Sequence, residues 1–233
     1  MEDLDYIAGA LLPVNKPLGW TSFDVVGKIR WLLCRRLGIK KLKVGHTGTL
    51  DPLATGVVVV CTGRKTKEID ALQQHVKEYV ATLQLGATTP SYDLEKPIDK
   101  TYPTAHITRS LIDEVLPRFR GEIWQVPPTF SAVKIDGKRA YEYARKGEEI
   151  DIKPKLLVID ELEVLSFDAA SMRLTLRIVC SKGTYIRALA RDMGEALGSG
   201  AHLTALCRMR VGDIRLEDCY SIEQIEEMLK LKQ

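Results

Sequence analysis

Residues 45–56, with the sequence GHTGTLDPLATG, constrain this chain more than any other segment, and they lead directly into four valines at 57–60. Glycine and Asp-Pro favour a turn, whereas a short run of valines is typical of a buried strand. The segment holds one carboxylate, Asp51. Such a junction would fix Asp51 in place and leave it accessible to a ligand, as a nucleophile or a general base requires. The alternative is a tight turn in which Asp51 caps its own backbone.

The composition is that of an ordinary globular chain, with 233 residues of which 45% are hydrophobic and 28% charged. No apolar run approaches the roughly 20 residues of a membrane span. The acidic first residues resemble neither a secretory signal nor a transit peptide. The five cysteines are far apart and include no Cys-x-x-Cys pair, so we predict neither disulfides nor a zinc site. We therefore expect a cytoplasmic protein.

Basic side chains gather in two places. No acidic residue lies between Asp24 and Asp51, whereas seven basic residues do, and a second basic stretch covers residues 134–146. Such runs are often only solvated faces. Together with a net charge of +3, they also fit a nucleic-acid footprint, and both interpretations stay open.

The hydrophobic pattern predicts an α+β fold with a mixed sheet. Residues 125–154 are rich in turns and charge and are predicted to leave the core. We expect helices at 22–37, 108–116, 184–197 and 221–230, and strands at 57–61, 78–85, 156–167, 172–180 and 203–214. The glycine-rich segment does not predict a nucleotide site, because the Lys-Ser/Thr of a P-loop is missing.

Two further features could carry function. Tyr79 begins an alternating strand, where it could be core packing or could stack on a base. Tyr185 and Arg187 lie where a strand meets a helix, and they could be ordinary packing and surface charge. An arginine beside a buried aspartate would keep that carboxylate ionised, because it lowers the aspartate pKa.

Taken together, these motifs resemble the TruB family of tRNA pseudouridine synthases, in the right order and over nearly the whole chain. The matching segments are VNKPLGWTS at 14–22, KVGHTGTLDPLATG at 43–56, TK at 66–67, KEY at 77–79, VPP at 126–128, SAVK at 131–134, YEYAR at 141–145 and SKGTYIR at 181–187. The resemblance implies the pseudouridine synthase fold, in which helices flank a central, largely antiparallel mixed sheet. It also implies one catalytic domain over residues 1–233, with a thumb-like, RNA-gripping insertion at about 125–154.

The resemblance implies isomerisation of uridine 55 in the T-loop of tRNA to pseudouridine, after the base is flipped out. Asp51 would act at the ribose, on C1′ or on a C2′ proton, and Arg187 would pair with Asp51. Tyr79 would stack on the uracil. His46 would fill the space that the flipped base leaves.

The remaining implied roles concern RNA binding. Tyr185 would line the pocket, and Lys67, Lys134, Leu206 and Arg208 would contact RNA. The resemblance implies no metal or other cofactor, no obligatory protein partner and a monomer that binds the T-arm.

The chain departs from the family pattern at three places. Cys207 stands where an arginine is usual, so one RNA contact would be lost. Residues 90–96 alter a loop that is commonly Asp/Thr-rich. The sequence stops at Gln233, where longer members carry a PUA-like domain, so we expect a short form.

Two other functions are alternatives to a stand-alone tRNA pseudouridine synthase. The first is an RNA-binding or RNA-folding module with secondary catalysis. The second is the archaeal and eukaryotic type that works in a guide-RNA particle, and that type relies on a PUA domain and partner proteins.

Overall fold

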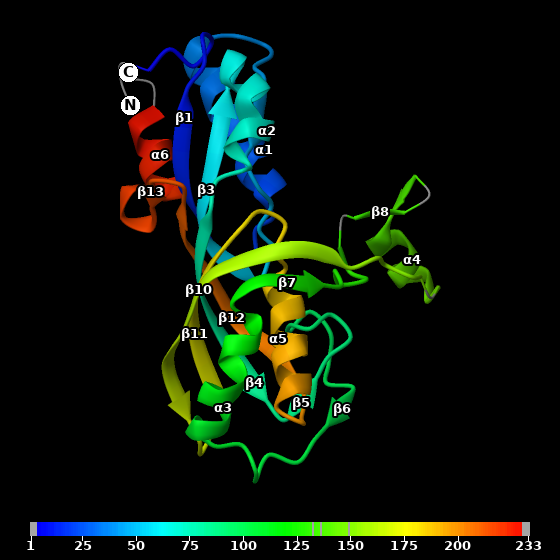
Figure 1. Cartoon of the computed structure of the whole chain (residues 1–233). Coiled ribbons are helices and arrows are strands. Elements are labelled where there is room, and N and C mark those ends of the chain that lie inside the picture. Colours follow the sequence, from blue (N-terminus) through cyan, green and yellow to red (C-terminus); the bar gives the residue numbers. More distant parts are fainter. Residues whose placement is uncertain (1–3, 132, 136, 149, 230–233) are drawn as a thin grey trace. The chain divides into compact units, whose positions relative to one another are not determined.

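The computed structural model describes residues 4–131, 133–135, 137–148 and 150–229 (Figure 1). The chain forms two compact units, Met1–Tyr79 with Leu206–Gln233, and Val80–Ala205. Strands β4 (Lys77–Leu85) and β12 (Ala201–Val211) have residues in both units. The assignment of the whole chain to one catalytic domain stays a prediction.

The sheet of the first unit is built on β3 (Ala54–Thr62), which is buried along nearly its whole length. The predicted valine strand is therefore confirmed. Strands β1 (Leu11–Lys16) and β2 (Val44–His46) pair with β3 antiparallel, and β12 pairs with it in parallel. Strand β13 (Ile214–Arg215) pairs antiparallel with the end of β12. Because the sheet contains both parallel and antiparallel pairs, it is mixed, as predicted.

Helix α1 (Ser22–Leu37) covers the first unit's sheet with its apolar face. Thr21 and Asp24 form a reciprocal capping box at its start, and Gly38 ends it in the left-handed conformation. Helix α6 (Ile222–Leu229), in the predicted helical segment, begins with a capping box between Ser221 and Gln224. The short helices of this unit are η1 (Gly63–Glu68), α2 (Ile69–Leu72) and η3 (Leu216–Asp218).

The second unit continues with the strand order β12-β4-β11-β10-β7. Strands β10 (Lys155–Asp168) and β11 (Arg173–Cys180), both predicted as strands, form an antiparallel hairpin, and β7 (Gly121–Gln125) pairs antiparallel with β10. Buried and half-buried residues alternate along β4, as its sequence predicts. The other elements are β5 (Ala87–Thr88), β6 (Lys100–Thr101), α3 (Arg109–Val115), η2 (Leu116–Phe119) and α5 (Ile186–Ala196).

The predicted excursion at residues 125–154, hereafter the insertion, forms its own small sheet. Strands β8 (Lys134–Ile135) and β9 (Lys138–Arg139) pair antiparallel, and α4 (Ala140–Lys146) follows directly. The α+β prediction with a mixed sheet flanked by helices is thus confirmed. Of the helices in the described ranges, none combines the length and apolarity that crossing a membrane would take.

Candidate active site

Asp51 lies in the loop that joins β2 to β3, residues 47–53, here called the Asp51 loop. The loop is tied to the start of α1, because the Leu50 N–H donates to Ser22 Oγ at 2.8 Å and Ser22 Oγ donates to the Leu50 carbonyl at 3.3 Å. Both residues are buried. The Ala54 N–H closes the turn onto the Asp51 carbonyl at 3.0 Å, while the Asp51 residue itself is only half-buried. The carboxylate thus belongs to a fixed backbone that still reaches solvent.

A buried lysine, Lys16 at the end of β1, supports the same loop. Its residue has no exposed surface. Its Nζ donates to the carbonyls of Trp20 at 2.6 Å, Pro17 at 3.0 Å and, more weakly, Pro52 at 3.5 Å. Burial lowers the pKa of Lys16 to about 8, and the negative charge of Asp51 opposes that shift. The positive charge of Lys16 therefore attracts the Asp51 carboxylate, and its Nζ anchors the carbonyl of Pro52, the residue after Asp51.

A second buried cation, Arg208 on β12, holds the other end of the loop. Its Nε donates to the Val57 carbonyl at 2.6 Å, and its Nη atoms donate to the carbonyls of Gly48 at 3.0 Å and Thr49 at 3.4 Å. The strands approach closely here, since a Cβ on Gly56 (φ +104°) would lie 2.2 Å from the Arg208 carbonyl oxygen. Only glycine fits that position. In this conformation Arg208 is 2% exposed, so its contacts are with the loop backbone, and its predicted role in RNA binding stays untested.

His46, which ends β2, is neutral in this environment. Burial lowers its pKa, the positive charge of Arg208 lowers it further, and the Gly48 hydrogen bond opposes the shift. Its Nδ1 accepts from the Gly48 N–H at 3.2 Å, so the proton of the neutral ring is assigned to Nε2. Phe23 packs edge-on against the His46 ring, with 5.4 Å between centroids. This is a fixed, uncharged ring, which suits a residue that fills space.

Three other predicted residues belong to the same unit as Asp51. Tyr79 is 8% exposed on the buried face of β4. Leu206 pairs with Ala54, three residues after Asp51, and is half-buried. Lys67 is exposed on η1. The first unit therefore collects most of the predicted site on one sheet and its connecting loops.

Arg187 belongs to the second unit, where it is buried at the start of α5. Its Nε lies 3.7 Å from an Asp93 carboxylate oxygen, and its Nη atoms donate to the carbonyls of Ser91 at 3.1 Å and Phe130 at 2.9 Å. Arg187 thus joins the loop around Asp93 to the insertion. Its predicted pairing with Asp51 stays a prediction.

Tyr185 is positioned by a buried amide, Gln125. The Tyr185 N–H donates to Gln125 Oε1 at 2.9 Å, and Gln125 Nε2 donates to the Tyr185 carbonyl at 3.2 Å. Both backbone groups at the start of α5 are thereby satisfied by one side chain. Lys134 is exposed on β8 of the insertion, as an RNA contact would require.

Three of these side chains, Lys16, Asp93 and Gln125, have no role that the sequence alone predicts. Lys16 lies in the matching segment 14–22. The local signal for its role is a lysine between a strand and a Pro-x-Gly turn. Asp93 was hidden because its loop departs from the family pattern. For Gln125 no local signal exists, because its partner is 60 residues away.

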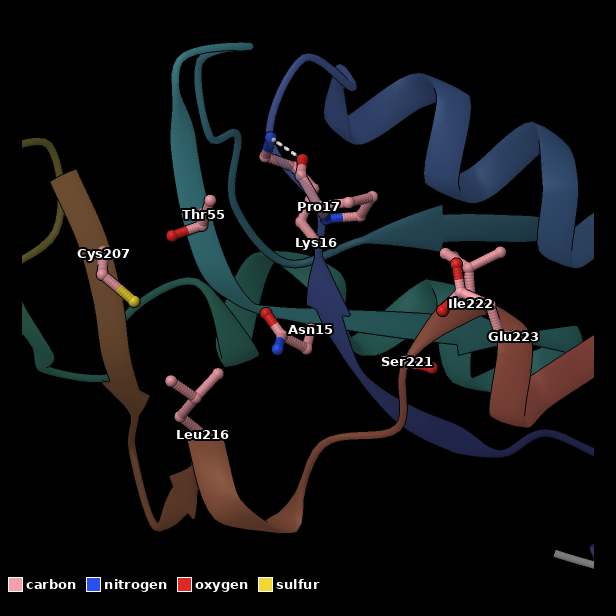
Figure 2. A pocket seen from close by; sticks show the side chains of 9 residues that line it. All are labelled: Asn15, Lys16, Pro17, Thr55, Cys207, Leu216, Ser221, Ile222 and Glu223. Carbon is pink, nitrogen blue, oxygen red and sulfur yellow. Dashed lines mark hydrogen bonds between the residues drawn. The ribbon is translucent and has the colours of Figure 1, made fainter. Parts of the chain in front are cut away.

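The first unit also contains a pocket of about 350 Å³, shown in Figure 2. Asp51 is not among the residues that line it. Cys207 and Thr55 are cross-strand partners on its wall, whereas the neighbours of Cys207 along β12 point to the other face of the sheet. The lining residues are Asn15, Lys16, Pro17, Thr55, Cys207, Leu216, Ser221, Ile222 and Glu223. The unusual Cys207 therefore lies on the face opposite Arg208.

The described part of the chain offers no cluster of three His, Cys, Asp or Glu side chains suited to a metal ion. None of the five cysteines, which all lie in the described ranges, forms a disulfide. The chemistry available to the site is that of a carboxylate, two fixed cations, a neutral imidazole and a buried tyrosine.

The fold and these residues place the protein in the class of pseudouridine synthases. Solved structures agree: the chain is 28% identical to one from a crystal structure of a Cbf5-Nop10-Gar1 complex, with a TM-score of 0.69. The match covers 95% of this chain but spans only about half, 54%, of that one.

Family comparison is more specific. Residues 35–186 match the N-terminal domain of the TruB family pseudouridylate synthases, and residues 187–233 match the tRNA pseudouridylate synthase B C-terminal domain. The chain is 64% identical to tRNA pseudouridine synthase B of Bacteroides thetaiotaomicron and 63% identical to that of Phocaeicola vulgatus. Each match covers 97% of this chain and 95% of the relative. The chain belongs to the TruB family of pseudouridylate synthases.

Proposed function

We propose that this protein isomerises uridine 55 in the T-loop of tRNA to pseudouridine, with Asp51 as the nucleophile or base and without a cofactor. The observation that carries the proposal is the Asp51 loop itself, in which a half-buried carboxylate sits on a backbone fixed by Lys16 and Arg208. The names of relatives that are more than 60% identical support tRNA as the substrate.

The reaction is an isomerisation, so the product has the same composition as the uridine. The bond between N1 and the ribose C1′ breaks while Asp51 bonds to C1′ or removes a C2′ proton. The uracil turns within the pocket, and C5 bonds to C1′ as the Asp51–C1′ bond breaks or the proton returns to C2′. The proton on C5 is then released, and N1 gains a proton. Because the base must leave the loop first, flipping costs a few kcal/mol, which binding contacts have to offset.

The other side chains take positioning roles in this proposal. Tyr79 stacks on the uracil, and base–aromatic stacking is worth about 1–3 kcal/mol. His46, held neutral by its surroundings, fills the space of the flipped base without attracting a phosphate. Arg187 pairs with Asp51, and Tyr185 lines the pocket.

RNA binding is assigned to exposed cations and to residues beside the loop. Lys67 and Lys134 contact phosphates, and Leu206 and Arg208 border the bound nucleotide. We further propose that the protein works as a monomer in the cytoplasm without a protein partner, since a reducing compartment suits five cysteines that form no disulfide.

The test is tritium release from a tRNA transcript labelled at C5 of its uridines, with no other RNA or protein added. We expect one equivalent of tritium per tRNA, and none when position 55 is cytidine. Release that persists with cytidine at position 55 would refute the positional assignment. No release despite tight binding would favour an RNA-folding module, and release only after a guide RNA is added would favour the guided mechanism.

A further inference from the structure

Helix α1 carries an exposed stripe opposite its buried face. Phe23, Gly27, Trp31 and Arg35 recur every four residues and therefore follow one side of the helix. Phe23 is 73% exposed and Trp31 is 53% exposed. A Cβ on Gly27 would meet nothing within 4 Å, so the space between the two rings is open. Two large aromatic rings thus face solvent on a stable, capped helix where core packing does not require them.

Positive charge surrounds the second ring. Lys28 Nζ and Arg35 Cζ each lie 5.4 Å from the centroid of Trp31. Lys28 forms an ion pair with Glu226 on α6, whereas Arg35 is exposed to solvent. No acidic residue occurs from 25 to 50, so the stripe and the segment that follows it attract anions.

The stripe is continuous with the Asp51 loop. Phe23 is the residue that packs edge-on against His46, at the entrance to that loop. Trp31 lies eight residues further along α1, which at 1.5 Å per residue is about 12 Å of helix. A ligand bound at His46 would therefore need to extend by only a few nucleotides to reach Trp31.

We propose that this α1 face is a second RNA contact, where an unpaired base of the tRNA substrate stacks on Trp31 and Arg35 binds an adjacent phosphate. Unpaired bases are recognised by stacking on aromatic side chains with cations beside them. Arg35 and the basic residues that follow it, with no acidic residue from 25 to 50, favour RNA over an apolar protein partner. The proposal rests on the proposed function, since it names where that substrate is held outside the catalytic loop.

The test is the Kd of a tRNA transcript for the full chain and three variants, Trp31→Ala, Trp31→Leu and Trp31→Phe. Loss of one stacked base should raise the Kd at least fivefold, because the low end of stacking is about 1 kcal/mol. We expect this for Ala and for Leu, whereas Phe should stay within about twofold of wild type. Melting temperatures should agree within about 2 °C, because the residue is exposed.

Two results would overturn the proposal. One is an unchanged Kd for Trp31→Ala, and the other is a Leu variant that binds as well as wild type, which would indicate an apolar contact of the kind that proteins make. The binding assay does not depend on turnover. A wild type that binds through Trp31 but releases no tritium would therefore refute the proposed function alone, and a fully active enzyme indifferent to Trp31→Ala would refute this inference alone.

Discussion

The Asp51 loop and the insertion use basic side chains in opposite ways. In the Asp51 loop, the cations of Lys16 and Arg208 are buried, and their hydrogen bonds go to backbone carbonyls. In the insertion, Lys134 is exposed, and the paired strands β8 and β9 that carry it are held by short local contacts such as the Ala140 N–H to the Val133 carbonyl at 2.8 Å. A buried cation fixes the chain, whereas an exposed cation stays available to a polyanion.

The comparison separates two kinds of mutational effect. Changes to the buried cations should lower stability and the rate of conversion, because they release the backbone that carries Asp51. Changes to the exposed cations should lower affinity and its salt dependence, with little effect on folding. Single substitutions at the two kinds of site can therefore tell the two effects apart.

Arg208→Met should have the largest effect on stability. It removes the donor to three carbonyls at a site that is 2% exposed, which should cost about 3 kcal/mol, because hydrogen bonds from a charged donor are worth more than neutral ones. For a chain of this size the melting temperature should fall by roughly 6–12 °C. Calorimetry checks the shift.

Arg210→Met is the matched control for that experiment. It lies on the same strand, is partly exposed and pairs with Glu78 at 3.1 Å. We expect a loss of at most about 1 kcal/mol. If the two variants were equally destabilised, burial of Arg208 would not be the reason for its importance.

Lys16→Met should lower the single-turnover rate by up to about a hundredfold, since a small displacement of a catalytic group can have that effect. Its pH dependence gives a second readout. The folded pKa of about 8 lies below the ordinary 10.5, so above pH 8 the unfolded chain binds the extra proton. The stability of wild type relative to Lys16→Met should therefore rise between pH 8 and 10.5, by at most about 3 kcal/mol. Urea titrations in which this difference stayed constant would show that the Lys16 charge is not destabilised by burial.

Lys134→Ala should raise the tRNA Kd by a few-fold and leave the melting temperature unchanged. The slope of log K against log salt should become shallower by about one, as expected when one phosphate contact is lost. Arg173→Ala, an equally exposed cation on β11 of the same unit, serves as the control and should alter neither quantity. A sharp drop in melting temperature for Lys134→Ala would instead make this residue structural.

The smallest expected effect concerns His46. Because its folded pKa is lowered, the unfolded chain takes up the proton first as the pH falls through 6.5. Stability should therefore decline on acidification through that window, and less so in His46→Asn. An NMR titration of the ring should give a midpoint below 6.5, whereas a midpoint above it would mean that the histidine is charged and able to bind phosphate.

Much of the fold could be predicted because its signals are local. The capping box of Thr21 and Asp24, the glycine at 38 and the valines of β3 each depend on a few neighbouring residues. The alternation that placed Tyr79 on a buried face is equally local. The order of the motifs then predicts a catalytic role for Asp51 without any knowledge of its surroundings.

What could not be predicted depends on contacts between distant segments. Arg208 reaches Gly48 across 160 positions, and its sequence environment resembles that of any strand arginine. Gln125 and Asp93 show the same limit, because their partners Tyr185 and Arg187 are supplied by another element. The sequence pattern therefore indicates which residues belong to motifs, whereas the fold determines which side chains hydrogen-bond to them and fix their positions.

In the proposed reaction Asp51 carries the chemistry, and the cations that fix its loop are buried, whereas the cations that contact phosphates are exposed. The most direct test is single-turnover tritium release by Asp51→Asn with all the C5-labelled tRNA bound. We predict a loss of at least a hundredfold, in line with removal of a catalytic base or nucleophile at about 10²–10⁴-fold, with the Kd within about twofold of wild type. Conversion at the wild-type rate in the bound complex would contradict the account.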